Sequence, residues 1–227
     1  MTDYGGAYRD LRLRVTELVK TRPEPDLVAF PVTTPQWRVR DVIAHLAGVC
    51  DDVMTGNLHG VATDEWTTAQ VAKRRDWPFE KVLTLWDEHA SAIEPRMNDF
   101  PPVAIGQMLF DAVTHEHDVR GAWRTPGGRD APGVEIAFGW AIERLSERFV
   151  HESLGTLVVV TDVGTHNVGE GEPTATLRAS RFELVRAMTG RRSSAQVLAY
   201  DWDGTVDPEH LLLSTTIFAL PETDVVE

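Results

Sequence analysis

The sequence predicts a mainly helical α+β protein, with an N-terminal four-helix bundle (residues 1–152) and a small C-terminal α+β domain (residues 153–227). Through the first part, apolar residues recur at the three-and-four spacing of amphipathic helices. Near residue 153 the pattern changes to short runs of β-branched residues separated by glycine-rich turns. A chain of 227 residues is long enough to form both cores.

Five segments have helical apolar spacing: residues 6–20, 37–56, 79–95, 107–123 and 134–150. A proline-rich break follows the first segment, and Gly56 ends the second. Helices of this length with moderate connections are typical of an antiparallel bundle. The connection 56–78 is longer than usual, and we expect it to hold a short helix around residues 65–73 that covers a site.

The C-terminal part combines strands with one clear helix. Residues 156–180 predict two strands around a glycine-rich turn, because β-branched residues alternate there. A helix follows, with Ser180 as its N-cap and Gly190 as its stop. A further strand is expected at residues 195–202, and residues 211–220 are expected either to end the sheet or to form a closing helix.

Charge and composition exclude several classes of function. The chain has 35 acidic and 22 basic residues, a net charge of −13 that argues against binding to duplex nucleic acid. The longest aliphatic run, LVVV at residues 157–160, is far shorter than a membrane span. The N-terminal segment has no apolar stretch typical of a signal peptide, so we expect a cytoplasmic protein without a membrane partner.

The cysteine count limits the chemistry further. Cys50 is the single cysteine, so the chain forms no internal disulfide and holds no cysteine-based zinc ribbon or iron–sulfur cluster. Its apolar neighbours predict a small core residue, with catalysis as the less favoured alternative.

The fourth helical segment places titratable groups where core residues are expected. Its apolar stripe runs through Met108, Ala112, His115, Val119 and Ala122, so an imidazole occupies the buried face. Asp111 precedes His115 by four residues and therefore lies one turn away on the same face. A buried imidazole beside a carboxylate must be hydrogen-bonded, ion-paired or bound to a metal.

The second helical segment carries a matching histidine. His45 borders its apolar stripe, so His45, Asp111 and His115 can converge between two helices. Three such ligands leave a fourth position open, as in catalytic metal sites, and they favour zinc over nickel, iron or manganese. A buried ion pair between Asp111 and His115 is the structural alternative. His89 is the spare ligand if Asp111 fails.

The polar neighbours of His115 point elsewhere. His117 is rotated roughly 200° from His115 around a helix, so both cannot bind one metal. We expect Glu116, His117 and part of Asp118 either to lie on a solvated flank or to hydrogen-bond behind the ligands.

These two segments resemble a known family. WRVRDVIAHLAG (residues 37–48) and DAVTHEHDVRGAW (residues 111–123) resemble the DinB-like four-helix bundle and, more specifically, the actinobacterial mycothiol-dependent maleylpyruvate isomerase family. The tail ASRFELVRAMTGRR, with DWDG after it, is similar to that family's small C-terminal domain, which resembles sterol-carrier proteins. The resemblance covers nearly the whole chain, in the same domain order.

The resemblance implies a site and a cofactor. A divalent metal, usually zinc, would be held by His45, Asp111 and His115, although the family's isomerases have Glu at the position of Asp111. The small thiol mycothiol would bind the metal as its thiolate and attack a small electrophilic substrate, in isomerisation or in S-transfer. The reacting sulfur would then come from the cofactor and not from Cys50.

The C-terminal domain is expected to close over the metal end of the bundle. Arg191 and Arg192 are candidates for binding an anionic group of the substrate. As basic residues just after a helix, they also stand where they would offset the helix dipole, and Arg120 allows the same two interpretations.

Two other functions fit the same residues. One is a metal-dependent hydrolase on the same bundle, and the other is a non-catalytic binding or regulatory module that keeps the fold.

Overall fold

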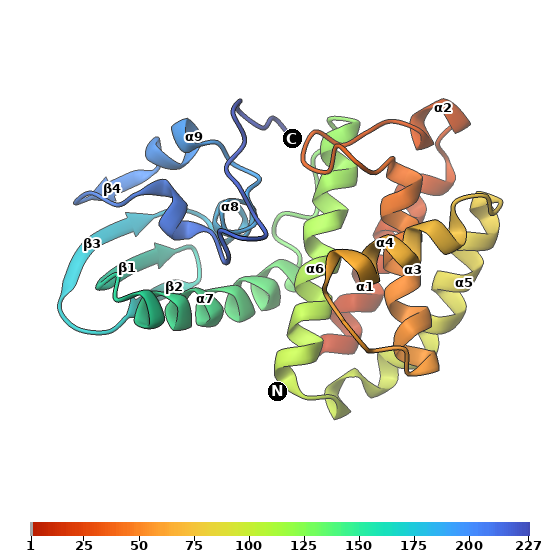
Figure 1. The fold of residues 1–227 in the computed structure, drawn as a ribbon, viewed down its shortest axis with the longest axis horizontal. Coiled ribbons are helices and arrows are strands. Elements are labelled where there is room, and N and C mark those ends of the chain that lie inside the picture. The colour runs from red at the N-terminus through yellow and green to blue at the C-terminus, as the bar shows by residue number, and fades with distance from the viewer. Residues whose placement is uncertain (1) are drawn as a thin grey trace. The chain divides into compact units, whose positions relative to one another are not determined.

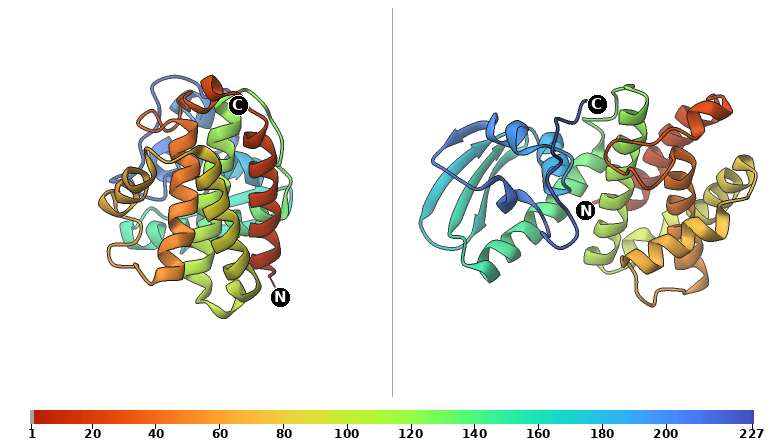
Figure 2. Two further views of the ribbon diagram at one scale, coloured as in Figure 1. Left: turned by 90° about the vertical axis from the view of Figure 1, so that its right-hand side faces the viewer. Right: turned by 45° about the horizontal axis from the view of Figure 1, so that its top comes forward.

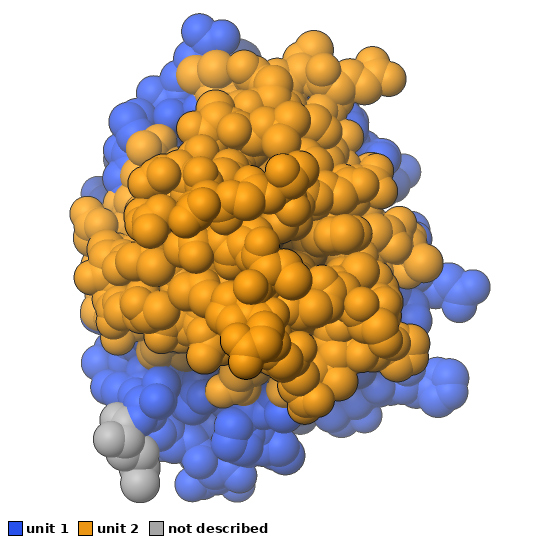
Figure 3. Space-filling view, turned by 90° about the vertical axis from the view of Figure 1, so that its left-hand side faces the viewer, with its two compact units in different colours: residues 1–127, 227 blue, residues 128–226 orange. Residues whose placement is uncertain are grey.

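The computed structural model describes residues 2–227, and most of them are helical (Figure 1). Within this range the chain forms two compact units. The first contains the residues up to Gly127 together with Glu227, and the second contains Gly128–Val226 (Figure 3). No helix in the described range is both long and apolar enough to cross a membrane.

The first unit is a four-helix bundle with short additions. Its helices are α1 (Tyr4–Lys20), α2 (Glu24–Leu27), α3 (Val39–Thr55), α4 (Asp64–Arg74), α5 (Phe79–Ile93), η1 (Glu94–Asp99) and α6 (Pro102–Ala122). The long helices α1, α3, α5 and α6 lie side by side, as the left panel of Figure 2 shows. This confirms the predicted bundle and its first four helices. The short helix expected in the 56–78 connection is α4.

Local sequence explains where these helices begin and end. The Asp3 carboxylate accepts a hydrogen bond from the Gly6 amide at 2.8 Å and caps α1. Thr63 caps α4 in the same way through the amide of Trp66. Helix α3 ends at Gly56, which adopts a left-handed conformation with φ of 72° that a residue with a side chain adopts less readily.

The bundle interior is filled from the predicted apolar stripes. Leu11 and Val15 of α1, Ile43 and Leu46 of α3, and Trp86 of α5 are almost fully buried. Burial of this apolar surface is the main favourable term in folding. It also holds α3 and α6 in contact, and these are the two helices that carry the predicted ligands.

The second unit is a mixed sheet with helices. Its helices are α7 (Pro132–Glu152), α8 (Arg181–Met188), α9 (Ser194–Leu198) and η2 (Pro208–Leu211), and its strands are β1 (Thr156–Thr161), β2 (Gly164–Gly169), β3 (Pro173–Arg178) and β4 (Asp201–Asp203). The strand order is β2-β1-β3-β4. The β1–β3 pair is parallel, and the other two pairs are antiparallel.

Some predicted elements of this unit differ from the structure. Residues 156–180 form three strands and not two. A tight turn at residues 162–163 joins β1 to β2 as a hairpin, and β3 follows the glycine-rich turn. The strand expected at 195–202 is instead α9 followed by β4, since Ser193 and Gln196 form a capping box that starts a helix. Residue 211 ends η2, and residues 212–220 form bends and turns, neither the strand nor the closing helix expected there.

The boundary between the units also differs from the predicted one at 152/153. The compact units divide between Gly127 and Gly128, because the fifth helical segment, α7, packs against β2 and α8. Its apolar spacing predicts that α7 has a buried face, but does not identify what covers that face.

Candidate metal site

The structure brings His45, Asp111 and His115 together. The Nε2 atom of His45 on α3 lies 3.1 Å from Oδ2 of Asp111 on α6. The Nε2 atom of His115 lies 3.5 Å from Oδ1 of the same carboxylate. One potential ligand atom from each residue lies within 4.8 Å of the other two. The side chain of Asp111, one methylene shorter than that of glutamate, therefore reaches both imidazoles.

A hydrogen bond to Gln70 indicates which ring nitrogen of His45 carries hydrogen. Its Nδ1 lies 2.8 Å from the amide oxygen of Gln70, and the amide nitrogen of Gln70 donates to Asp52 at 2.7 Å. A carboxylate accepts but does not donate, so Gln70 must present its oxygen to the imidazole. His45 therefore carries a proton on Nδ1, and its Nε2 faces Asp111.

His115 is held in a similar way. Its Nδ1 donates to Oδ2 of Asp118 at 3.0 Å, and the hydroxyl of Thr33 donates to Oδ1 of the same carboxylate at 2.7 Å. An ionised carboxylate only accepts hydrogen bonds, so Nδ1 of His115 is the donor in this contact. The Nε2 atom of His115 is thus also the atom that faces Asp111.

The two imidazoles sit in a mostly buried, partly aromatic environment. His45 is 2% exposed and His115 is 7% exposed. Their ring centroids are 5.1 Å apart, and the indole of Trp37 lies 5.1 Å from His45 and 5.8 Å from His115. The side chain of Asp111 is 34% exposed, so the site reaches solvent beside this carboxylate.

The two Nε2 atoms and the Asp111 carboxylate face one another across a short distance. With a proton on each Nδ1, both Nε2 atoms point lone pairs at an anionic carboxylate, which is unfavourable unless a cation or a proton lies between them. Burial disfavours the charged form of His45, but the Asp111 carboxylate and its hydrogen bonds outweigh burial and raise the His45 pKa. The site therefore attracts positive charge.

The donor set fits a divalent metal. Two imidazole nitrogens and a carboxylate oxygen are typical ligands of zinc at catalytic sites, where a fourth position stays open. The Asp111 carboxylate presents one oxygen to each imidazole, at 3.1 and 3.5 Å, and one potential ligand atom from each of the three residues lies within 4.8 Å of the other two. Hydrogen bonds from both Nδ1 atoms match the usual support of metal-binding histidines.

The solvated flank expected on α6 is absent from the described residues. Glu116, His117 and Asp118 are all buried. The Glu116 carboxylate forms ion pairs with Arg14 of α1 at 2.8 Å and with Arg120 at 3.0 Å. Asp118 instead has the alternative role expected for these residues, a hydrogen bond behind a ligand.

Other candidates lie outside the site. His89 lies beside Asp51 instead, with 3.5 Å between its Nδ1 and a carboxylate oxygen. Cys50 is buried against the Tyr8 hydroxyl, and burial raises the pKa of its thiol to about 12, so it is not a thiolate at neutral pH.

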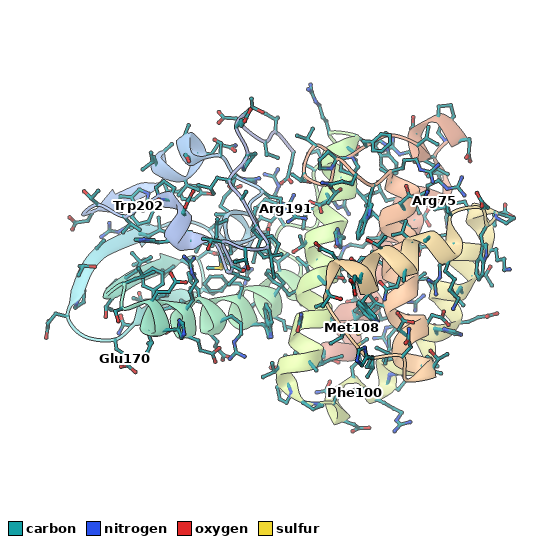
Figure 4. The ribbon with its side chains drawn as sticks, viewed as in Figure 1. Arg75, Phe100, Met108, Glu170, Arg191 and Trp202 are labelled. Atoms are coloured by element: carbon teal, nitrogen blue, oxygen red, sulfur yellow. The ribbon has the colours of Figure 1, made fainter. Side chains whose placement is uncertain are left out.

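The candidate substrate arginines are buried in the second unit. Arg192 forms a two-pronged ion pair with Glu183, at 2.6 and 2.9 Å. Arg191, which Figure 4 labels, donates to the carbonyl oxygen of Thr189 at 2.6 Å. Both guanidinium groups thus have partners within their own unit, and their role toward a substrate stays a prediction.

Sequence reasoning missed three residues that contact the imidazoles or their partners: Trp37, Thr33 and Gln70. Trp37 belongs to the motif that carries the family resemblance, but nothing in its spacing indicates contact with both histidines. Gln70 lies on α4, and the unusual length of the 56–78 connection was the signal that pointed to this helix.

Comparison with known proteins shows the fold. The structure of a histidine-to-alanine mutant of the mycothiol-dependent maleylpyruvate isomerase matches with a TM-score of 0.61 and 11% identity. Another structure of that isomerase matches with a TM-score of 0.56 and 12% identity. Each match covers 89% of this chain and 93% of the other. No protein-family model matches the sequence, and no curated protein matches it.

Proposed function

We propose that the protein is a divalent-metal-dependent enzyme that uses mycothiol either to isomerise a small electrophilic substrate or to form a thioether with it by displacing a leaving group. The observation that carries this proposal is the convergence of two imidazole Nε2 atoms and one carboxylate. The fold shared with the mycothiol-dependent isomerase structures supports the choice of thiol and of reaction class.

Each residue of the site has a distinct task in this proposal. His45, Asp111 and His115 hold the metal, which is zinc by the preference of such ligands. A divalent metal, when bound there, favours the thiolate form of a thiol at neutral pH. Trp37 packs against both imidazoles and shields one side of them from water. The exposed edge of Asp111 leaves an approach for the thiol and the substrate.

In this proposal the thiol of Cys50 has no part in the reaction. Cys50 is fully buried, and its raised pKa keeps it neutral at physiological pH. An external thiol supplies the nucleophile instead. Arg191 and Arg192 remain the proposed contacts for an anionic group of the substrate, and an anion at Arg192 has to compete with Glu183.

Metal analysis of three purified proteins tests the site: the wild type, His115→Ala and His89→Ala. The last variant removes a histidine that lies outside the site and serves as the matched control. We expect close to one divalent ion per chain in the wild type and in His89→Ala, and little in His115→Ala. Equal metal content in all three proteins would remove the proposed site.

Activity assays then separate the three functions. Turnover of an electrophilic substrate that depends on both metal and mycothiol supports the proposal. Metal-dependent hydrolysis of an ester or amide without thiol would assign the hydrolase alternative. A protein without bound metal, whose His45→Ala variant is unchanged in stability and in binding, would favour a non-catalytic module.

A further inference from the structure

Helix α4 contributes a buried amide to the candidate metal site. Gln70 is 3% exposed and lies between two residues of α3, His45 and Asp52. Its Oε1 is 2.8 Å from His45 Nδ1, and its Nε2 is 2.7 Å from Asp52 Oδ2. The three side chains form a continuous hydrogen-bonded chain, shielded from water, that ends at a metal ligand.

The direction of this chain is determined by its far end. Both oxygens of the buried Asp52 accept hydrogen bonds, one from Gln70 and one from the Asn57 side chain at 2.9 Å. The amide of Gln70 is therefore oriented with its oxygen toward His45. An oxygen at that place favours the His45 tautomer with hydrogen on Nδ1, and this tautomer leaves Nε2 able to bind a cation.

Close packing holds α4 where Gln70 can act. A Cβ atom added to Gly48 of α3 would lie 2.6 Å from Cβ of Gln70, so the absence of a side chain at Gly48 allows this approach. Arg74, one turn after Gln70 and fully buried, forms an ion pair with Asp51 of α3 and donates to the carbonyl oxygen of Gln70 at 2.9 Å. These contacts fix the position of Gln70 against α3.

We propose that Gln70, oriented by Asp52, is a positioning residue that sets the tautomer of His45 for metal binding. This inference rests on the metal-binding part of the proposed function and is independent of the thiol and of the substrate. It assigns a function to the long 56–78 connection, whose helix carries the amide. The partner of His45 is the neutral amide of Gln70, which orients the imidazole without adding charge. The partner of His115 is the carboxylate of Asp118, which orients the imidazole and also places a negative charge beside it.

Two variants test the role of the amide. Gln70→Met keeps a long side chain but removes the oxygen that accepts from His45. In the double variant Gln70→Glu with Asp52→Asn, the new carboxylate accepts from both His45 and the new amide, and Asn57 can still donate to the amide oxygen. This exchange keeps the net charge and all three hydrogen bonds, with one of them reversed. Val71→Ala, on the same helix, is the control for looser packing of α4.

The first readout is the affinity for Zn²⁺, measured by competition with a chromophoric chelator. The second is the tautomer of His45 in the metal-free protein, measured by long-range ¹H–¹⁵N NMR. We expect Gln70→Met to bind Zn²⁺ about 10- to 100-fold more weakly and to lose the preference for hydrogen on Nδ1. The double variant should keep the tautomer and bind Zn²⁺ at least as tightly as the wild type, because a carboxylate then accepts from His45. Val71→Ala should keep both the tautomer and the affinity of the wild type.

Specific results would overturn the inference. One is a Gln70→Met protein with wild-type tautomer and affinity. Another is an equal loss of affinity in Gln70→Met and Val71→Ala without any change of tautomer, which would assign Gln70 to packing alone. Because the NMR experiment uses metal-free protein, it decides the role of Gln70 even if thiol-dependent activity is absent and the proposed function fails.

Discussion

Replacing Gly48 with alanine should weaken both the fold and the metal site. The new Cβ would lie 2.6 Å from Cβ and 2.8 Å from Cγ of Gln70, and 2.9 Å from Nη1 of Arg74. Carbon atoms in contact are normally about 3.5 to 4.0 Å apart. A Cβ atom is bonded directly to the backbone and cannot rotate away, so α4 must move from α3 by about 1 Å.

Two opposing terms set the magnitude of the effect. Alanine is favoured over glycine in the middle of a helix by about 1 kcal/mol. Overpacking a close contact costs about 1 to 3 kcal/mol. The net expectation is a loss of roughly 1 kcal/mol in the free energy of unfolding. A shift of about 1 Å also lengthens the 2.8 Å hydrogen bond between Gln70 and His45 beyond the range of a hydrogen bond.

Thermal unfolding and Zn²⁺ affinity, measured together, check this prediction. The matched control is Gly139→Ala on α7, where an added Cβ meets no atom within 4 Å. In the control only the helix preference acts, so Tm should rise or stay the same, and Zn²⁺ affinity should not change. A Gly48→Ala protein with a similarly raised Tm and unaltered Zn²⁺ affinity would refute the reasoning about α4.

Three further predictions concern other buried groups. Asp118→Asn removes the charge that supports His115 and should weaken Zn²⁺ binding about 10- to 100-fold in a calorimetric titration; an unchanged affinity would contradict that role. Burial raises the pKa of Cys50 from 9.0 to about 12. The unfolded chain therefore releases this proton first, and above about pH 9 the free energy of unfolding should fall by about 1.4 kcal/mol per pH unit from this group. Denaturant titrations should show a shallower fall for Cys50→Ala, and equal slopes would exclude the effect. Glu116→Leu leaves Arg14 and Arg120 without their shared carboxylate. It should lower the free energy of unfolding by about 2 kcal/mol, less than the loss of a fully buried ion pair, because the Arg14 side chain is 29% exposed. An unchanged Tm would show that these ion pairs contribute little.

The sequence alone determined the bundle and the candidate ligands, because both follow from short-range geometry. Apolar spacing predicts which face of each helix is buried, whatever it packs against. A separation of four residues places Asp111 and His115 on the same face of any helix. His45 could be added because it borders a second apolar stripe, and buried stripes of neighbouring helices face each other.

Only the tertiary structure decided what surrounds these groups. Gln70 reaches His45 across 25 residues of sequence, and Thr33 reaches Asp118 across 85. No periodic pattern encodes such pairs, because they depend on how helices and loops pack. The same reason explains why the division between the compact units before α7 was not predicted, since α7 has an apolar stripe that fits a bundle or a sheet equally well. The apolar spacing of a helix depends on residues close in sequence, whereas the segment that packs against that helix depends on close packing in three dimensions.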